Sequence, residues 1–300
     1  MGCGMESVLV LVIGACLSAG AALVAWLAHT RSPGSIPAHT AAVPAAAARR
    51  TANWRWAGVI TGLVAGGVAA ASGALGRGLL LAGPVFGLCV LAGVVAGEIS
   101  VRPAGGPTRT AVVEVRRVRD YLPHGLAKAV LAAAAVLLAL VTVTTATAGP
   151  DDLGRGTVLL SRCGPGSWEG HGPWAGSFYS VPLAAMVATG LIVAGVALRV
   201  VIRRARTGAD PDGVAADDAL RQRAAWTITG ACGILTALPL AGVCLVSAAA
   251  LLSFSCHPAW WTYAGWALLA VLIPTAALMA WCAAVLLAPA RAVTAVLPAR

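Results

Sequence analysis

The sequence predicts an all-α protein, a polytopic membrane helix bundle with seven transmembrane helices, its N-terminus outside and its C-terminus in the cytoplasm. Three observations predict this fold. Apolar residues make up 59% of the 300 residues and charged residues only 11%, whereas roughly 25% charged residues are usual in soluble domains. The apolar residues form long uninterrupted runs, and the basic residues lie between those runs. A chain with so little polar surface needs lipid as the solvent for most of its length.

The apolar runs have the length that membrane spans need. A helix requires about 20 apolar residues to cross a hydrocarbon core of roughly 30 Å. The runs show neither the apolar stripe of an amphipathic helix nor the alternation of apolar and polar residues of a barrel strand. This pattern favours helices that are surrounded by lipid or by one another. Within one transmembrane domain, seven runs qualify: residues 7–28, 56–75, 79–97, 126–148, 181–201, 224–250 and 260–288. Only Gly76, Arg77 and Gly78 separate the second and third spans, so we expect a tight helical hairpin there.

The distribution of basic residues predicts the orientation. The first, third and fifth loops and the C-terminal tail hold 18 of the 21 Lys and Arg residues. The other side holds only Arg77, Arg155 and Arg162. Cytoplasmic loops of membrane proteins carry an excess of Lys and Arg, so the larger group marks the cytoplasm. The same rule accounts for the net charge of +10. We therefore expect the lipid bilayer to be the partner of these basic residues, and we expect no binding to nucleic acid.

Small residues and prolines suggest how the spans pack. Gly62 and Gly66 form a small-residue pair at four-residue spacing, as do Gly190 and Ala194, and such pairs let helix backbones approach closely in lipid. Pro239 and Pro274 lie within the sixth and seventh spans, where each removes a backbone donor and is expected to kink its helix. Paired kinks either open a cavity between the two helices or belong to an inert bundle.

The expected spans lack the residues that membrane enzymes and ion-coupled carriers use. No Asp, Glu, Lys, Arg or His lies in mid-span, and ionisable residues at that depth mark relays and ion pathways. The only lysine, Lys128, opens the fourth span, so a retinal Schiff base in the last helix is excluded. No Walker A loop, HExxH or GxSxG motif occurs. We therefore expect no enzyme activity, no cofactor and no catalytic or metal site in the bundle.

Two cytoplasmic loops have chemical content. The third loop, residues 98–125, is basic and partly apolar around Arg116, Arg117 and Arg119. Its periodicity does not distinguish a helix from a strand. It is either a solvated loop or, beside the cytoplasmic leaflet, an interfacial element or a docking site for a cytoplasmic partner. The fifth loop places Asp210, Asp212, Asp217 and Asp218 between two arginine clusters. We expect a flexible connector there, because the EF-hand spacing of a cation site is missing.

The third loop also carries a resemblance to known proteins. Gly97-Glu98, Arg109-Thr110 and the segment 115–123, read VRRVRDYLP, follow an apolar hairpin. This pattern resembles uncharacterised multi-pass integral membrane proteins of actinobacteria, from about the second span to the start of the fourth. The resemblance implies a membrane location. That group has no assigned activity, so it implies no functional residue.

Two cysteines are expected on the outer side. Cys163 lies in the long outer loop 149–180, and Cys256 lies between the sixth and seventh spans. The other cysteines lie in spans or on the N-terminal tail: Cys3, Cys16, Cys89, Cys232, Cys244 and Cys282. The outer face of a bacterial membrane is oxidising, which predicts a Cys163–Cys256 disulfide. Two free thiols and a Cys₂His₂ metal site with His171 and His257 are the alternatives.

These observations predict a multi-pass protein of the plasma membrane without enzymatic activity. The leading hypothesis is an accessory or partner-binding component that associates with another membrane or cytoplasmic protein. The alternative is a transporter or permease subunit that passes a small or apolar solute between the kinked sixth and seventh helices. A hydrophilic cavity lined by several spans favours transport, whereas a solid core of small residues favours the accessory role.

The orientation is testable with reporter fusions. Fusions after Arg50, Arg119 and Arg206 are expected to report the cytoplasm, because the charge rule places those loops inside. Fusions after Arg155 and His257 are expected to report the outer side. A single loop that reports the opposite side contradicts the seven-span arrangement.

Overall fold

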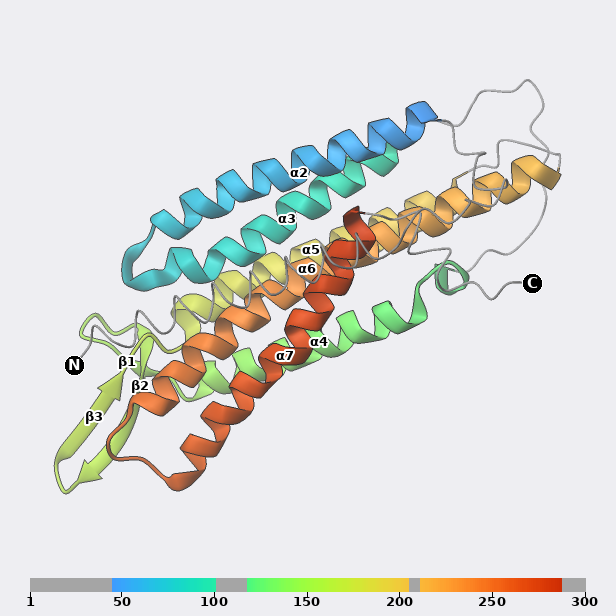
Figure 1. Cartoon of the computed structure of the whole chain (residues 1–300). Helices are drawn as coiled ribbons and strands as arrows, with labels where there is room; N and C mark the ends of the chain where they lie inside the picture. Colours follow the sequence, from blue (N-terminus) through green and yellow to red (C-terminus); the bar gives the residue numbers. More distant parts are fainter. Residues whose placement is uncertain (1–44, 101–117, 205–210, 288–300) are drawn as a thin grey trace.

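The computed structural model describes residues 45–100, 118–204 and 211–287. Within these residues the protein is a bundle of long helices with a small sheet at one end (Figure 1). The 3-10 turns are η2 (Ala74–Gly76) and η3 (Val118–Asp120), and the strands are β1 (Gly149–Pro150), β2 (Gly156–Gly164) and β3 (Ser167–His171). The helices are α2 (Ala45–Ala71), α3 (Arg77–Ser100), α4 (His124–Ala146), α5 (Ser177–Arg203), α6 (Pro211–Ser253) and α7 (Ala259–Leu287).

Five of these helices are long and apolar enough to cross a membrane: α3, α4, α5, α6 from Asp217 onward, and α7. They correspond to five of the predicted spans. The second predicted span falls in α2, a 27-residue helix that is not among the five. The first predicted span, 7–28, lies outside the described residues. The structure thus has the helices of a multi-pass membrane protein, while the count of seven and the orientation stay predictions.

The turn between α2 and α3 lies earlier than the sequence predicts. Helix α2 ends at Ala71 rather than at residue 75, and Arg77 already belongs to α3. Gly73 has φ of 98° and Gly76 has φ of 71°, a left-handed region that favours glycine. These two glycines reverse the chain, so the predicted centre of the turn at Gly76–Gly78 is wrong by a few residues.

Two predicted loops contain regular structure. Helix α6 begins at Pro211 and is 43 residues long, so the expectation that the fifth loop is a flexible connector is wrong beyond residue 210. Its Arg221 forms an ion pair with Asp217 at 2.7 Å, one helical turn away, and this pairing supports helix over coil. The segment 149–180, predicted as an outer loop, contains an antiparallel sheet with the strand order β1-β2-β3 and the first residues of α5.

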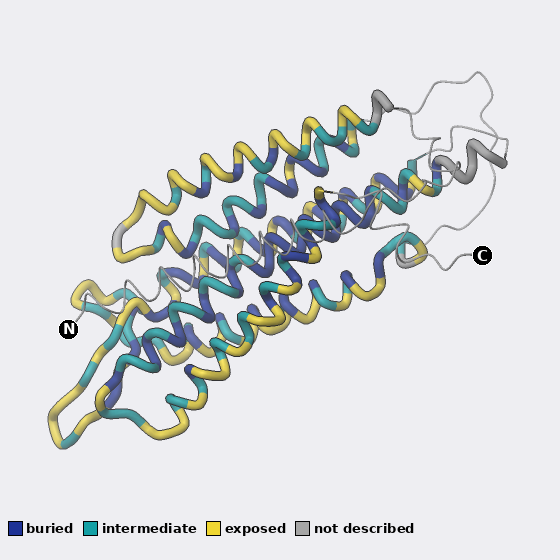
Figure 2. Tube along the Cα trace, viewed as in Figure 1, coloured by how far each residue is buried: buried dark blue, intermediate teal, exposed yellow. Residues whose placement is uncertain are grey.

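Helix α6 is the central helix of the bundle. It packs against α3, α4, α5 and α7, and 67% of its apolar window is buried, against 22% to 39% in the other four candidate spans. Figure 2 shows the buried residues running along its length. Leu235, Ile228 and Ala237 are fully enclosed. The buried hydroxyl of Thr236 donates to the backbone oxygen of Cys232 at 2.7 Å, so this polar group is satisfied within its own helix.

Small residues allow the neighbouring helices to approach α6. A Cβ atom at Gly87 of α3 would lie 2.6 Å from the Cα atom of Leu235, and one at Gly233 of α6 would collide with Cys282 of α7. Gly62 and Gly66 of α2 are buried against α3. Gly190 of α5 also faces the Leu235 side chain. The small-residue pairs noted in the sequence are therefore packing contacts between helices.

The two ends of the bundle differ in character. The α2–α3 turn, the sheet and the α6–α7 loop lie together at one end, which we call the sheet end (Figure 1). The hydroxyl of Tyr179 in α5 donates to the Leu75 carbonyl there, at 2.8 Å. At the opposite end the Arg204 guanidinium donates to the Glu98 carbonyl at 2.7 Å. Loops that the charge rule assigns to the same side therefore meet at the same end.

Replacement of Gly87 by valine tests the packing of α6. The new side chain would contact the Leu235 backbone, so we expect a loss of about 1–3 kcal/mol. The thermal unfolding midpoint of the detergent-solubilised protein measures it. Gly195→Val is the control, because a Cβ at Gly195 of α5 meets nothing within 4 Å. Equal losses in the two variants contradict the close packing at Gly87.

Candidate functional site

The sheet end is built from local sequence signals. Asp151 follows β1 and accepts hydrogen bonds from the backbone N–H groups of Leu153 at 2.9 Å and Arg155 at 2.8 Å, a turn that aspartate side chains favour. Strand β2 then buries alternate residues, Thr157, Leu159 and Ser161. Gly166, with φ of 79°, reverses the chain into β3. We call β2, this reversal and β3 the hairpin.

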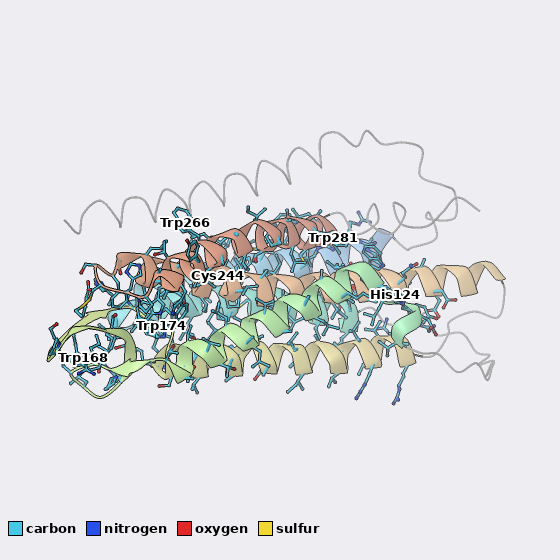
Figure 3. All side chains as sticks on the ribbon, turned by 90° about the horizontal axis from the view of Figure 1, so that it is seen from below. His124, Trp168, Trp174, Cys244, Trp266 and Trp281 are labelled. Carbon is cyan, nitrogen blue, oxygen red and sulfur yellow. A yellow bond between two sulfur atoms is a disulfide. The ribbon has the colours of Figure 1, made fainter. Side chains whose placement is uncertain are left out.

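Buried aromatic residues hold the base of the hairpin on the helices. Trp174 is 4% exposed, and its indole N–H donates to the Thr144 carbonyl of α4 at 2.9 Å. Trp174 and Leu159 pack with Phe254, at the end of α6, in a second apolar cluster. In Figure 3, Trp174 lies against the helices, whereas Trp168 lies at the far end of the hairpin.

Three arginines among the described residues of this end lie on aromatic rings. The guanidinium of Arg77 lies 4.5 Å from the centre of the Phe178 ring, and that of Arg155 lies 5.3 Å from the same ring. Arg162 lies 5.7 Å from the Trp168 ring. Such contacts are attractive because the face of an aromatic ring is electronegative. Arg77 and Phe178 thereby link the α2–α3 turn to the start of α5.

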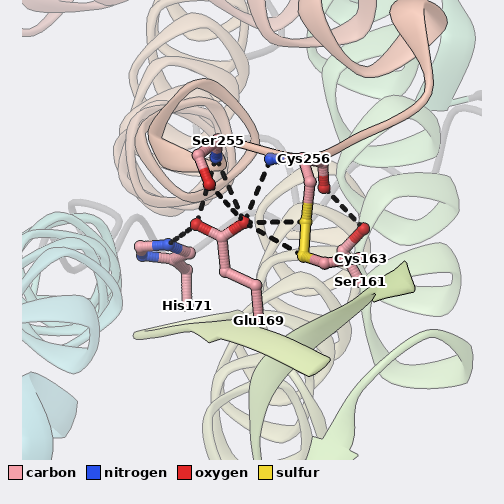
Figure 4. Close-up of a disulfide and its surroundings, with 6 residues drawn as sticks. All are labelled: Ser161, Cys163, Glu169, His171, Ser255 and Cys256. Atoms are coloured by element: carbon pink, nitrogen blue, oxygen red, sulfur yellow. Dashed lines mark hydrogen bonds and ion pairs between the residues drawn. A yellow bond between two sulfur atoms is a disulfide. The ribbon is translucent and has the colours of Figure 1, made fainter. Parts of the chain in front are cut away.

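A disulfide joins the hairpin to the α6–α7 loop. Cys163 of β2 and Cys256 are bonded, with their Cα atoms 5.5 Å apart, within the range that a disulfide requires. The Ser161 hydroxyl donates to the Cys256 carbonyl at 2.8 Å. The two cysteines are 93 residues apart in the sequence, and the structure brings them together as the sequence predicts. Figure 4 shows this disulfide with its neighbours.

A carboxylate completes the same connection. Glu169 of β3 accepts hydrogen bonds from the backbone N–H groups of Ser255 and Cys256, each at 3.1 Å, and from the Ser255 hydroxyl at 3.0 Å. Nε2 of His171 lies 3.0 Å from its Oε1 atom. The pKa of Glu169 is lowered to about 2, because these hydrogen bonds stabilise the ionised carboxylate. The bond from the Ser255 amide contributes most, followed by those from His171 and the Cys256 amide.

We refer to Cys163, Cys256, Glu169, His171 and Ser255 as the disulfide cluster (Figure 4). Oε2 of Glu169 lies 3.1 Å from the Cys256 sulfur and 3.6 Å from the Cys163 sulfur. The three side chains Cys163, Glu169 and Cys256 form a group with metal-ligating atoms within 4.8 Å of one another. A negative charge so close to the disulfide opposes attack by an anionic thiolate, the species that reduces disulfides.

The other predicted site residues are placed as follows. His171 joins the disulfide cluster, but Nε2 of His257 bonds to the Thr262 hydroxyl at 2.8 Å instead, so the Cys₂His₂ set is not assembled. Pro239 and Pro274 lie inside the continuous helices α6 and α7, and a kink at either stays a prediction. Of the basic segment, Arg116 and Arg117 lie outside the described residues, and Arg119 lies in η3.

Glu169 is the residue of this candidate site that the sequence did not reveal. Its signal is the alternation in Glu169-Gly170-His171, which puts two polar side chains on one face of a strand. That signal could be read only with β3 recognised as a strand. The segment was expected to be a loop, so the two residues had no common face in the prediction.

The opposite end contains a second polar network. The Tyr121 hydroxyl, just after η3, donates to Asp218 of α6 at 3.0 Å. Arg221 is 2% exposed, and besides pairing with Asp217 it donates to the Arg204 carbonyl at 2.8 Å. Asp217 and Asp218 therefore interact with Arg221 and Tyr121. This arrangement fixes helix ends to one another.

No family model matches this chain, and neither a curated protein nor a solved structure matches it.

Replacement of Glu169 by glutamine tests the electrostatic protection of the disulfide. One charge at about 4 Å is worth about 1 kcal/mol in water, so we expect reduction by an anionic thiol to be about fivefold faster in the variant. The rate is measured in detergent as the appearance of Cys163 and Cys256 thiols.

An uncharged phosphine is the control reagent for this variant. A carboxylate does not repel this uncharged reagent. The substitution is therefore expected to change the rate of disulfide reduction by the phosphine less than the rate of reduction by the thiol. Added salt should reduce the difference between the variant and the unchanged protein in the rate of reduction by the thiol, because salt screens charges. Equal acceleration with both reagents would show that the hairpin had only loosened.

Proposed function

We propose that this chain is a non-enzymatic multi-pass component of the cell membrane that binds a partner protein through the hairpin. The observation that carries the proposal is a contrast within the hairpin. Its base is fixed by the disulfide, by Glu169 and by Trp174. Trp168 near its tip is 64% exposed.

The chemistry of the hairpin tip supports a protein partner. Trp168 and Arg162 lie in contact there, and tryptophan and arginine are the residue types enriched in the energetic centres of interfaces. A tip that is already ordered loses little conformational entropy on binding. The cross-link and the carboxylate supply that order without a large soluble domain. The orientation from the charge rule places this surface outside the cytoplasm.

The packing of the bundle also supports an accessory role. Around α6 the helices meet through glycines, and Leu235, Ile228 and Ala237 have no exposed surface. A permeation path along α6 would have to displace these contacts. The resemblance of the region around residues 97–123 to actinobacterial membrane proteins agrees with this location and adds no activity.

A second candidate function is the movement of an apolar solute. It is favoured by a groove of about 280 Å³ between α4 and α5, lined by alanine, leucine and valine side chains that include Leu138, Val141 and Leu183. The sequence had suggested a cavity between α6 and α7 instead, where Gly233 and Cys282 are in close contact. We rank this function second because the groove offers no polar side chain to select a solute.

Replacement of Trp168 by alanine tests partner binding. If the hairpin tip is the centre of an interface, the loss of its ring should cost at least about 2 kcal/mol, or roughly thirtyfold in affinity. The measurement is the amount of co-purifying protein per copy of the chain after extraction from native membranes in mild detergent.

Leu131→Ala is the matched control for this experiment. Leu131 of α4 is 67% exposed on an apolar helix, far from the hairpin in sequence, and its truncation is expected to leave co-purification unchanged. A chain that purifies alone from native membranes, or a partner retained equally by both variants, contradicts the proposed function.

A further inference from the structure

In the disulfide cluster one carboxylate oxygen lies close to both sulfur atoms, as an oxygen ligand lies beside two sulfur ligands of one metal ion. In a tetrahedral zinc site the Zn–S bonds are about 2.3 Å and the Zn–O bonds about 2.0–2.2 Å, which puts sulfur and oxygen ligands about 3.5 Å apart. Oε2 of Glu169 lies 3.1 Å and 3.6 Å from the two sulfurs. The carboxylate is thus already where a third ligand of two cysteine thiolates would stand.

We propose that, once the Cys163–Cys256 disulfide is reduced, Cys163, Cys256 and Glu169 bind one zinc ion. The fourth position is filled by water, because Cys163 is exposed to solvent. His171 contacts Oε1 of Glu169 at 3.0 Å and acts as the positioning residue for the carboxylate, a role common beside zinc ligands.

The reaction balances with a thiol as the reductant. Two electrons and two protons convert the disulfide to two thiols, while two molecules of the reducing thiol are oxidised to their own disulfide. Zinc then displaces both thiol protons to solvent and forms two Zn–S bonds and one Zn–O bond. Two thiolates beside the Glu169 carboxylate would repel one another, and a divalent cation removes that repulsion.

The backbone around the cluster favours retention of the site after reduction. Glu169 stays anchored by the N–H groups of Ser255 and Cys256, and Ser161 still donates to the Cys256 carbonyl. None of these hydrogen bonds involves the S–S bond. The cluster therefore has two closed states, a disulfide and a zinc dithiolate, each of which holds the hairpin on the α6–α7 loop.

The test is zinc binding by the full chain in detergent, before and after reduction. Zinc is titrated against a chromophoric chelator after the reductant is removed without oxygen. We expect one zinc ion per reduced chain and none per oxidised chain. Cobalt in place of zinc should give the near-ultraviolet absorption of thiolate ligation.

Variants separate this site from the other cysteines. Cys163→Ser combined with Cys256→Ser should abolish binding, Glu169→Gln should weaken it by at least about tenfold, and His171→Ala by about 10–100-fold. His257→Ala is the control, since His257 bonds to Thr262 instead, and it should bind as the unchanged chain does. Binding that persists in the double cysteine variant contradicts the site.

A measurement on the unchanged chain tests the proposal even if a variant fails to fold. Zinc should slow the alkylation of Cys163 and Cys256 in the reduced unchanged chain by at least about tenfold, because a bound thiolate is a poor nucleophile. If zinc leaves both alkylation rates unchanged, the proposal is overturned. Neither result depends on the partner protein, so this test can fail while the proposed function stands.

Discussion

The close approach of α6 to its neighbours is the contact on which the rest of the structure depends. Five helices of this chain are long and apolar enough to cross a membrane. In lipid, apolar helix surfaces gain little by meeting one another, so association relies on close van der Waals packing. Gly87 of α3 and Gly190 of α5 both meet Leu235, and Gly233 meets Cys282 of α7. These contacts make α6 the axis of the bundle and fix where its ends lie.

The site at the sheet end follows from the position of that axis. Helix α6 ends at Ser253, and the next residues present the backbone N–H groups of Ser255 and Cys256, which Glu169 accepts. The disulfide ties the same loop to β2. A small sheet that would be marginal in isolation is thereby attached to a rigid helix end. The order of this surface is supplied by the bundle.

Much of the fold could be predicted from the sequence, because continuous apolarity and charge asymmetry are strong signals. They located five helices, with most helix ends correct within a few residues. The start of α6 is the exception, because the aspartates around Asp217 led to the prediction of a loop there. The Cys163–Cys256 pairing followed from which cysteines lay in the loops predicted on the outer side. Glu169 was not predictable in the same way, because its role depends on β3 as a strand and on contacts with residues 86 positions away. Short strands rich in glycine give too weak a periodic pattern to reveal such a contact.

The most direct test of this account is mass-spectrometric mapping of the cysteines in protein taken from intact membranes, with free thiols trapped by alkylation before extraction. The account predicts that the peptides containing Cys163 and Cys256 are recovered joined by a disulfide, while Cys89, Cys232, Cys244 and Cys282 are recovered without one. Recovery of Cys163 and Cys256 both alkylated without prior reduction, or of either one bonded to a different cysteine, would contradict it.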